Sequence, residues 1–359
     1  MTTRTLRSRL TITVISLFCL CTAAAAQTRQ AIIRYDSVHH PAVGLHGMVV
    51  SQNDLASDIG RDILRQGGNA VDAAVATGFA LAVTLPRAGN LGGSGFMLAH
   101  LAESGETVAL DYRSIAPLAS DPDLFRMGDG EVDMDALTHG ARAAAVPGTV
   151  AGLYEAWQRW GSLPWPDLVA PARELAAKGI IVTHDLAFAL SQGEQTMRQF
   201  PSSAAIYMRP DGSGWQPGER LVQSDLAWSL TQIMEGGADA FYKGELAERI
   251  VAAFKADGGL IRRKDLAAYV VKERDIVTTD YRGYRVVSMP PVSAGGITLI
   301  QMLNMLSQFD VTALGAGSVA HLHLLALLMN RAAANRRTWL RDPDFGDVPI
   351  AESISMNVA

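Results

Sequence analysis

Two neighbouring stretches of the chain combine a flexible backbone with one strong cation. Asn90–Met97 holds a cluster of glycines, and Ala109–Arg113 is a short, mostly apolar segment that ends at Arg113. Glycine lets another chain or a ligand approach the backbone closely. A guanidinium group can grip a carboxylate through two parallel hydrogen bonds. The two stretches therefore predict a close-packed floor beside a carboxylate anchor.

Arg113 has two interpretations from the residues alone. The side chains alternate along 108–113, which predicts a strand with Arg113 at its end. Burying an arginine there without a partner would be costly. Arg113 therefore either pairs with Asp111 or another acid of this chain, or it binds the carboxylate of a ligand. The residues by themselves favour the internal ion pair.

Two further segments combine proline with glycine. Pro290–Gly296 begins with two prolines, which fix an extended entry, and ends with two glycines at the start of a predicted helix. Such a segment either presents N–H groups to a ligand or makes a tight turn from strand to helix, and the residues favour the turn. Val146–Thr149 is a smaller version, in which Thr149 is the predicted N-cap.

The common catalytic and cofactor motifs do not fit this chain. Gly92–Phe96 begins like a nucleophile elbow, but its last glycine is in the wrong place for G-x-S-x-G. The sequence has no dinucleotide fingerprint, no phosphate-binding loop and no H-E-x-x-H motif. His321 and His323 are two positions apart on a predicted helix, so they face different ways. The sequence therefore predicts no metal site and no cofactor.

The surrounding elements indicate a mixed α+β fold in one domain over 27–359. Gly47–Ser51 and Thr278–Pro290 are predicted strands, and Gly95–Leu101 with Thr107–Arg113 is a predicted antiparallel hairpin. The pattern from 149 onward is mostly helical, and no linker marks a boundary. Helices are predicted over 54–65, 70–83, 149–160, 166–178, 184–198, 224–235, 238–256, 264–269, 296–308 and 318–339.

The N-terminus has the three parts of a secretory signal peptide. Residues 1–9 contain three arginines and no acid, 10–21 are apolar, and four alanines at 23–26 precede Gln27. The apolar run is too short to span a bilayer. Residues 1–26 are therefore predicted to be a signal peptide, which places the mature protein in the periplasm or outside the cell.

Removal of that signal changes the composition in two useful ways. Both cysteines lie within 10–21, so the mature chain would have neither disulfides nor thiol chemistry. Loss of the three arginines shifts the net charge from −5 to −8. An acidic exported protein is a poor match for nucleic acid or for an anionic membrane surface, so neither is predicted as a partner.

Seven segments taken in order resemble the large-subunit portion of bacterial γ-glutamyltransferases, which are also called glutathione hydrolases. The resemblance runs from about residue 43 to about residue 348. Each motif alone is a weak signal, but the seven motifs in this order are specific. The segments are Gly67–Ala76, Asn90–Met97, Leu110–Arg113 with Pro117, Val146–Gly152, Tyr281–Tyr284, Pro290–Gly296 and Asp342–Phe345.

This resemblance implies an N-terminal nucleophile hydrolase-type fold, a four-layer αββα sandwich. In such enzymes a precursor cuts itself, and the new N-terminal threonine becomes the nucleophile with its own amino group as base. The threonine attacks a γ-glutamyl amide, and the acyl group then passes to water or an amine. The family's arginine for the substrate α-carboxylate corresponds to Arg113, which reverses the preference for an internal ion pair.

The chain departs from the family at the nucleophile. No T-T-H segment occurs in it, since Thr278 and Thr279 are followed by Asp280. We therefore expect no catalytic residue in this chain, with Arg113 as its substrate-binding residue. The expected partner is a small subunit that bears the threonine, from the same precursor or from a separate chain. Alone, the chain should turn over no γ-glutamyl compound and should be unstable, because the sandwich is incomplete.

Three origins are consistent with this departure: a fragment or frameshifted reading, one part of a split enzyme, or an inactive relic. Two other functions stay open. A glutaryl-type β-lactam acylase shares the fold and would also use an arginine for a free carboxylate. An exported remnant could instead keep the pocket as a binding subunit without the chemistry.

Overall fold

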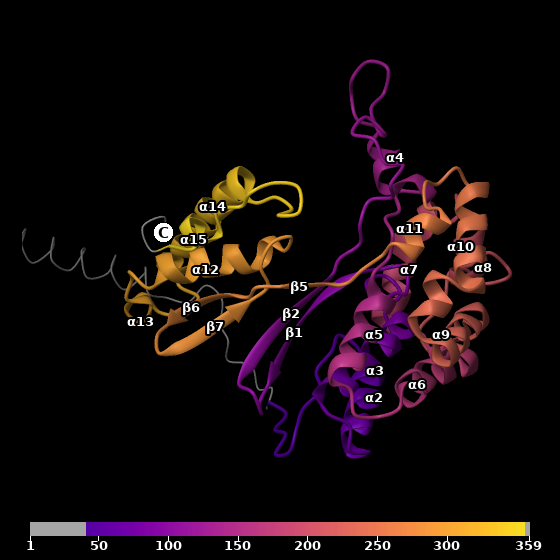
Figure 1. The fold of residues 1–359 in the computed structure, drawn as a ribbon, viewed down its shortest axis with the longest axis horizontal. Helices are drawn as coiled ribbons and strands as arrows, with labels where there is room; N and C mark the ends of the chain where they lie inside the picture. The colour runs from indigo at the N-terminus through magenta and orange to yellow at the C-terminus, as the bar shows by residue number, and fades with distance from the viewer. Residues whose placement is uncertain (1–40, 356–359) are drawn as a thin grey trace, which may run out of the picture. The chain divides into compact units, whose positions relative to one another are not determined.

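The computed structural model describes residues 41–355, so the predicted signal peptide lies outside the described part of the chain. These residues form two compact units, Gly44–Glu273 and the residues from Arg274 onward (Figure 1). The single domain over 27–359 stays a prediction.

The first unit is built on two helices that meet at close range. α2 (Asp54–Arg65) begins at its N-cap Asn53, and α3 (Ala70–Thr84) is buried on most of its sides, as its Ala- and Val-rich sequence predicts. Gly60 of α2 brings the helices together, since a Cβ there would lie 2.3 Å from the hydroxyl of Thr77. Phe79 is fully buried at the centre of the core.

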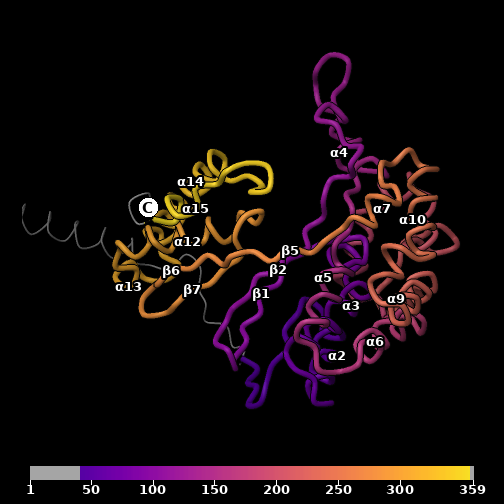
Figure 2. The backbone as a smooth tube through the Cα atoms, viewed as in Figure 1, coloured from indigo at the N-terminus to yellow at the C-terminus, as the bar shows by residue number. Residues whose placement is uncertain are grey.

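A short sheet lies against these helices. β1 (Gly95–Leu101) and β2 (Glu106–Tyr112) form the predicted antiparallel hairpin, with Gly95 opposite Tyr112. β5 (Lys272–Arg274) completes the strand order β1-β2-β5. α5 (Thr149–Trp160) packs on both strands of the hairpin and on α3, so it joins the sheet to the core (Figure 2).

The remaining helices form an outer layer. α6 (Trp165–Lys178) packs between α3 and α9 (Ser224–Tyr242), and α10 (Glu245–Ala256) packs on α9. The predicted break between 235 and 238 is confirmed by a kink at Gly237, where φ is 61°. The prediction of one helix over 238–256 is wrong, because the chain leaves helical geometry again at Lys243 and Gly244. The other elements of this unit are α4 (Met134–Thr138), the 3-10 helix Ala141–Ala143, β3 (Ile180–Ile181), α7 (His184–Met197), α8 (Pro201–Tyr207), β4 (Arg220–Leu221) and α11 (Arg263–Ala267).

The segment Gly67–Ala76 has a structural role in this unit. Asn69 and Asp72 form a capping box at the start of α3. The fully buried Asp72 carboxylate also accepts hydrogen bonds from the backbone N–H (3.0 Å) and the hydroxyl of Ser162. One carboxylate thus fastens the start of α3 to the turn after α5, which explains the motif without a ligand.

The second unit contains a hairpin under two helices. β6 (Val277–Tyr281) pairs with β7 (Tyr284–Ser288), and the turn has positive φ at Gly283. The prediction of one strand over 278–290 is therefore wrong in its continuity. α12 (Ala294–Leu306) packs on both strands and on α14 (Val319–Trp339), and the short α13 (Val311–Leu314) and α15 (Ile350–Ser353) complete the unit.

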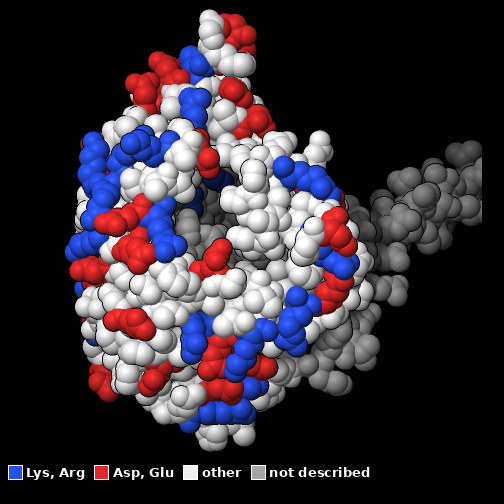
Figure 3. All heavy atoms as spheres, turned by 90° about the vertical axis from the view of Figure 1, so that its right-hand side faces the viewer, with Lys and Arg blue, Asp and Glu red and all other residues white. Residues whose placement is uncertain are grey.

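The outer face of the helices in the first unit carries charges of both signs. Figure 3 shows Lys and Arg interspersed with Asp and Glu across this face, and acidic side chains on the arm that projects ahead of α4. Within residues 41–355, no helix has both the length and the apolar run that a bilayer crossing requires.

The strand predicted at Gly47–Ser51 is wrong, because that segment has no strand pairing in the structure.

Candidate functional site

Arg113 stands directly after β2 and is exposed. Its guanidinium makes no hydrogen bond or ion pair with any residue of the described part of the chain. Because Arg113 is exposed, it does not pay the free-energy cost of burying an unpaired arginine. The ion pair with Asp111 or another acid, which the residues alone favoured, does not form among the described residues. An exposed guanidinium with its donors available can take up a carboxylate.

The backbone on both sides of Arg113 is held by hydrogen bonds. The Arg113 N–H donates to Oδ1 of the buried Asp111 at 3.0 Å. The Arg113 carbonyl accepts from the hydroxyl of Tyr269 at 2.8 Å. The Asp111 carboxylate thus meets the backbone of Arg113 rather than its side chain. The base of the arginine is fixed while its charged end stays open.

The first glycine cluster, Asn90–Met97, is hydrogen-bonded to the start of α5. The Gly93 carbonyl accepts from the N–H groups of Gly148 at 2.9 Å and of Thr149 at 3.2 Å. Thr149 is the first residue of the helix and Gly148 is its N-cap, with no side-chain cap. The predicted N-cap at Thr149 is therefore wrong, because a carbonyl from the glycine cluster satisfies the N–H groups that a cap would serve.

Tyr112, the neighbour of Arg113, fills the space that three glycines leave open. A Cβ would lie 2.7 Å from the Tyr112 ring at Gly95, 2.1 Å from it at Gly152, and 2.1 Å from the Tyr112 carbonyl at Gly148. The Tyr112 hydroxyl donates to the Phe96 carbonyl at 3.2 Å, and burial raises its pKa to about 12. Gly95, Gly148 and Gly152 therefore form a close-packed floor around Tyr112.

Two more tyrosines support this floor from α9 and from the segment after α11. Tyr242 donates to the Pro147 carbonyl at 2.8 Å and accepts from the Ala151 N–H at 3.3 Å. Tyr269 stacks on Tyr242, with ring centroids 5.5 Å apart and planes at 12°. Burial raises the pKa of both hydroxyls. No motif pointed to Tyr269, which lies 156 positions from Arg113 in the sequence.

The chain that leaves Arg113 is also tied down. Ile115 and Val146 form an antiparallel bridge with hydrogen bonds of 3.2 and 2.8 Å. The N–H of Leu118 donates to Oδ1 of the buried Asp265 at 2.8 Å. Three separate parts of the chain therefore converge at Arg113: the β1–β2 hairpin with its glycine cluster, the start of α5 and the segment around α11.

The second glycine cluster, Pro290–Gly296, is a tight turn in the second unit. Ser293 is the N-cap of α12 and accepts from the Gly295 N–H at 3.3 Å. A Cβ at Gly296 would lie 2.0 Å from the Met289 carbonyl, so the turn admits only glycine there. Of the two interpretations of this segment, the structure supports the turn from strand to helix.

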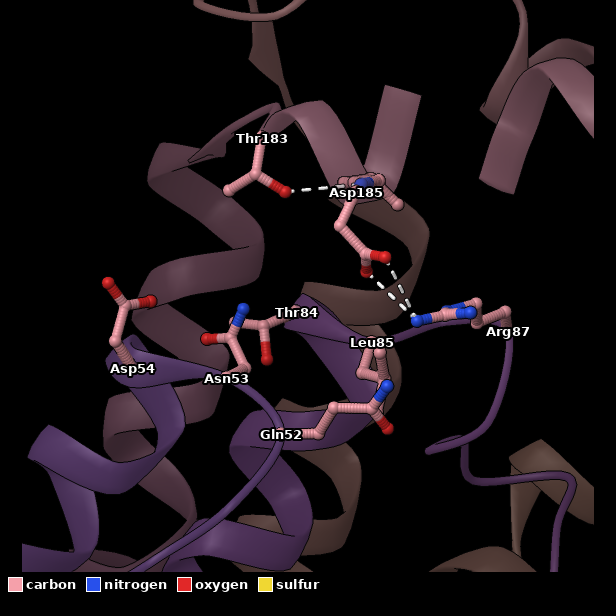
Figure 4. Close-up of a pocket in the computed structure, with 9 residues that line it drawn as sticks. Gln52, Asn53, Asp54, Thr84, Leu85, Arg87, Thr183 and Asp185 are labelled. Carbon is pink, nitrogen blue, oxygen red and sulfur yellow. Dashed lines mark hydrogen bonds and ion pairs between the residues drawn. The ribbon is translucent and has the colours of Figure 1, made fainter. Parts of the chain in front are cut away.

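Cavities also open elsewhere in the first unit. One of about 490 Å³ lies between the starts of α2 and α7, where Arg87 pairs with Asp185 at 2.9 Å (Figure 4). Thr183 on its wall caps α7 rather than facing a ligand. Two others, of about 350 and 310 Å³, share Leu91 and Leu226. Arg113 lines none of these three.

The described residues also bear on metal binding. Between residues 41 and 355, no group of three or more His, Cys, Asp or Glu side chains could hold an ion. His321 and His323 both lie on α14, and His321 Nδ1 accepts from the Gly317 N–H at 3.0 Å. The exposed guanidinium of Arg113, whose backbone is held on both sides, can recognise an anion.

Known proteins resemble this chain over most of its length. The Gamma-glutamyltranspeptidase family model matches residues 56–359. The glutathione hydrolase proenzyme of Escherichia coli (strain K12) is 44% identical over 333 residues, which cover 92% of this chain and 57% of that protein. The acylase ACY 1 proenzyme of Pseudomonas sp. (strain V22) is 39% identical over 320 residues, with coverage of 88% and 57%.

A solved structure agrees with these sequence matches. The crystal structure of Helicobacter pylori gamma-glutamyltranspeptidase has a TM-score of 0.86 and 41% identity, and it covers 89% of this chain and 91% of that one. This likeness confirms the predicted α+β fold of the N-terminal nucleophile hydrolase type. This chain spans a little over half the length of its curated relatives, 57% in the Escherichia coli case. From the family match and these likenesses together, this chain belongs to the gamma-glutamyltranspeptidase family.

Proposed function

We propose that this chain supplies the substrate anchor of a γ-glutamyltransferase, or glutathione hydrolase, whose nucleophilic threonine lies outside these 359 residues. The observation that carries the proposal is Arg113, whose exposed guanidinium has no partner among residues 41–355 while its backbone is held on both sides. Arg113 then binds the α-carboxylate of the γ-glutamyl group. Family membership and the absence of a T-T-H segment support the division of labour.

The proposed reaction is acyl transfer. A threonine hydroxyl of the partner attacks the γ-carbonyl, an oxygen–carbon bond forms, and the carbon–nitrogen bond breaks as the leaving amine takes up a proton. Water or a second amine then displaces the threonine from the acyl-enzyme. Arg113 contributes by holding the acyl group so that its γ-carbonyl stays in register with the nucleophile.

Reconstitution with a relative tests this proposal. Residues 27–359 are co-expressed with the part of the Escherichia coli glutathione hydrolase that starts at its T-T-H segment, and the purified complex is assayed with a γ-glutamyl anilide. We expect hydrolysis from the complex and none from either part alone. A complex that co-purifies but is inactive, or active residues 27–359 without the partner, would contradict the proposal. Failure of the two parts to associate would count against it as well.

A second function is favoured by one specific observation. The acylase ACY 1 relative is nearly as similar to this chain as the glutathione hydrolase, at 39% against 44% identity. A glutaryl acyl group would also offer a free carboxylate to Arg113, but it lacks the α-amino group of a γ-glutamyl group. Comparing a glutaryl anilide with a γ-glutamyl anilide in the same complex separates the two functions.

We further propose that the protein is exported and that its mature chain begins at Gln27. The basic start, the apolar run and the alanines before Gln27 support this location, in the periplasm or outside the cell. Expression of the full chain followed by N-terminal sequencing of the secreted or periplasmic protein tests it. A chain that stays in the cytoplasm with Thr2 near its N-terminus would contradict it.

A further inference from the structure

We propose that Tyr269 is a positioning residue for Arg113, through which the site selects acyl groups that carry a free α-carboxylate. This inference rests on the proposed role of Arg113 and extends it to a residue that no motif of the family resemblance includes. The contact that carries the inference is the hydrogen bond from the Tyr269 hydroxyl to the Arg113 carbonyl, at 2.8 Å.

The two hydrogen bonds at Arg113 act on opposite sides of its Cα. Asp111 holds the N–H at 3.0 Å, and Tyr269 holds the carbonyl. Together they fix the orientation of both peptide planes and hence the direction in which the side chain leaves the backbone. A long, flexible side chain can bind a carboxylate in a defined place only when its root is held in this way.

Tyr269 is itself held rigidly enough to do this. Its ring stacks on Tyr242, at 5.5 Å and 12°, and Tyr242 is fixed by two hydrogen bonds to the start of α5. Gly148 leaves the space for the Tyr269 hydroxyl, since a Cβ there would lie only 2.0 Å from that oxygen. Three segments thus cooperate to place one hydroxyl under Arg113.

The arrangement is more than general packing. The Arg113 carbonyl belongs to an exposed residue, where water could satisfy it at little cost. A half-buried tyrosine nevertheless directs its hydroxyl there, although it lies 156 positions away in the sequence. A bond that adds little to stability but fixes the anchor is expected where precision of the anchor matters.

The test uses the reconstituted complex and two substrates that differ by one group. A γ-glutamyl anilide carries the α-carboxylate, and a 4-aminobutanoyl anilide lacks it but keeps the amine. The ratio of their kcat/KM values measures how well the carboxylate is gripped. Loss of one hydrogen bond of about 1 kcal/mol predicts that Tyr269→Phe lowers this ratio about fivefold. The change should appear in KM for the γ-glutamyl substrate, with kcat nearly unchanged.

Tyr242→Phe is the matched comparison, because its hydroxyl contacts Pro147 and Ala151 rather than Arg113. It keeps the ring that stacks on Tyr269, so it should lower the melting temperature and should lower the ratio by less than Tyr269→Phe does. Partial unfolding of either variant lowers the rates of both substrates equally, so the ratio still reports on the folded molecules. An unchanged ratio in Tyr269→Phe, or an equal fall in both variants, would overturn the inference. An Arg113→Ala variant that keeps the wild-type ratio would instead overturn the proposed function.

Discussion

Two arginines at strand ends show how the same side chain serves different purposes in the two units. Arg113 follows β2, is exposed, and has no side-chain partner among residues 41–355. Arg274 ends β5 and forms a two-pronged ion pair with Asp344, at 2.7 and 2.8 Å. Its side chain is only 14% exposed. The second arginine has its carboxylate within the chain, whereas the first has its donors open.

The difference lies in what is held. At Arg274 the charged end is fixed by Asp344, which belongs to the segment Asp342–Phe345 of the family resemblance. At Arg113 the backbone is fixed and the charged end is open. The ion pair of Arg274 fastens one segment of the chain to another. The open guanidinium of Arg113 is available to bind a carboxylate from outside the chain. The four predictions below test whether the two arginines really differ in this way.

The largest effect is expected from Arg113 itself. In the reconstituted complex, Arg113→Ala removes two charge-assisted hydrogen bonds of about 1.5–3 kcal/mol each, so KM for a γ-glutamyl anilide should rise at least about a hundredfold. Arg113→Lys keeps the charge but loses the fork, and it should raise KM about tenfold. Steady-state kinetics with the complex measure both changes.

Arg274→Lys is the control for these kinetics. It changes the same side chain in the same way, but at a residue whose partner is Asp344. We expect KM within about twofold of the wild type, since an ion pair within the chain supplies no substrate contact. Equal rises in KM for the two lysine variants would remove the distinction between the arginines.

The next effect concerns the tyrosines beneath Arg113. Burial raises the pKa of Tyr112 from 10.0 to about 12 in the folded chain. Because the folded pKa is the higher one, the stabilisation is complete below pH 10 and is lost as the pH rises towards about 12. A shift of this size corresponds to about 2.7 kcal/mol. Urea unfolding at a series of alkaline pH values should show this loss, and Tyr112→Phe should lack the part due to Tyr112.

A Tyr112→Phe chain that loses stability as steeply as the wild type over this pH range would contradict the assignment. The loss would then come from other groups, and the floor beneath Arg113 would not depend on a buried protonated hydroxyl. The same series measured on Tyr242→Phe shows how far the neighbouring ring shares the effect, since burial also raises the pKa of Tyr242.

The hairpin that ends at Arg113 could be predicted because strand alternation is a local pattern, whereas the anchor role of Arg113 came from the family resemblance, since the residues alone favoured an internal ion pair. Alternation along the two strands predicted the hairpin, and the structure pairs the same two strands. The break at Gly237 was predicted correctly, but the break at Gly244 was missed. The apolar periodicity of the sequence continues across Lys243 and Gly244, the two residues between α9 and α10. The sequence pattern therefore does not show where α9 ends.

The supports of Arg113 could not be predicted from the sequence. Tyr269 and Asp265 reach the site from the segment around α11, far from β2 in the chain. The cap at α5 was assigned to Thr149, because a threonine before a helix is the usual cap. The structure supplies the Gly93 carbonyl instead, which only the fold brings there. Local patterns therefore predict the hairpin and the arginine at its end, whereas the contacts that hold this arginine are long-range and appear only in the structure.

A third prediction compares a glycine at the start of α5, near Arg113, with a glycine at the start of α12 in the second unit. Gly148→Ala places a Cβ 2.0 Å from the Tyr269 hydroxyl and 2.1 Å from the Tyr112 carbonyl, so the surroundings of Arg113 must move. We expect a loss of about 1–3 kcal/mol in unfolding free energy, together with a higher KM in the complex. Gly295→Ala is the matched change, because its nearest neighbour would be the Ser293 hydroxyl at 3.5 Å. In the first turn of α12 it should be neutral or stabilising by about 0.5 kcal/mol.

The smallest effect is expected at the pair in the second unit. Asp344→Asn removes one charge from a partly exposed ion pair, with side chains 14% and 29% exposed, so the loss of stability should be about 1–2 kcal/mol. KM for the γ-glutamyl anilide should not change. A double-mutant cycle with Arg274→Gln isolates the pairwise contribution, because each single change also leaves a partner without its ion pair. A coupling near zero would mean that the geometry at Asp344 does not hold the segment. A raised KM in Asp344→Asn would mean that this pair, like Arg113, supports the substrate site.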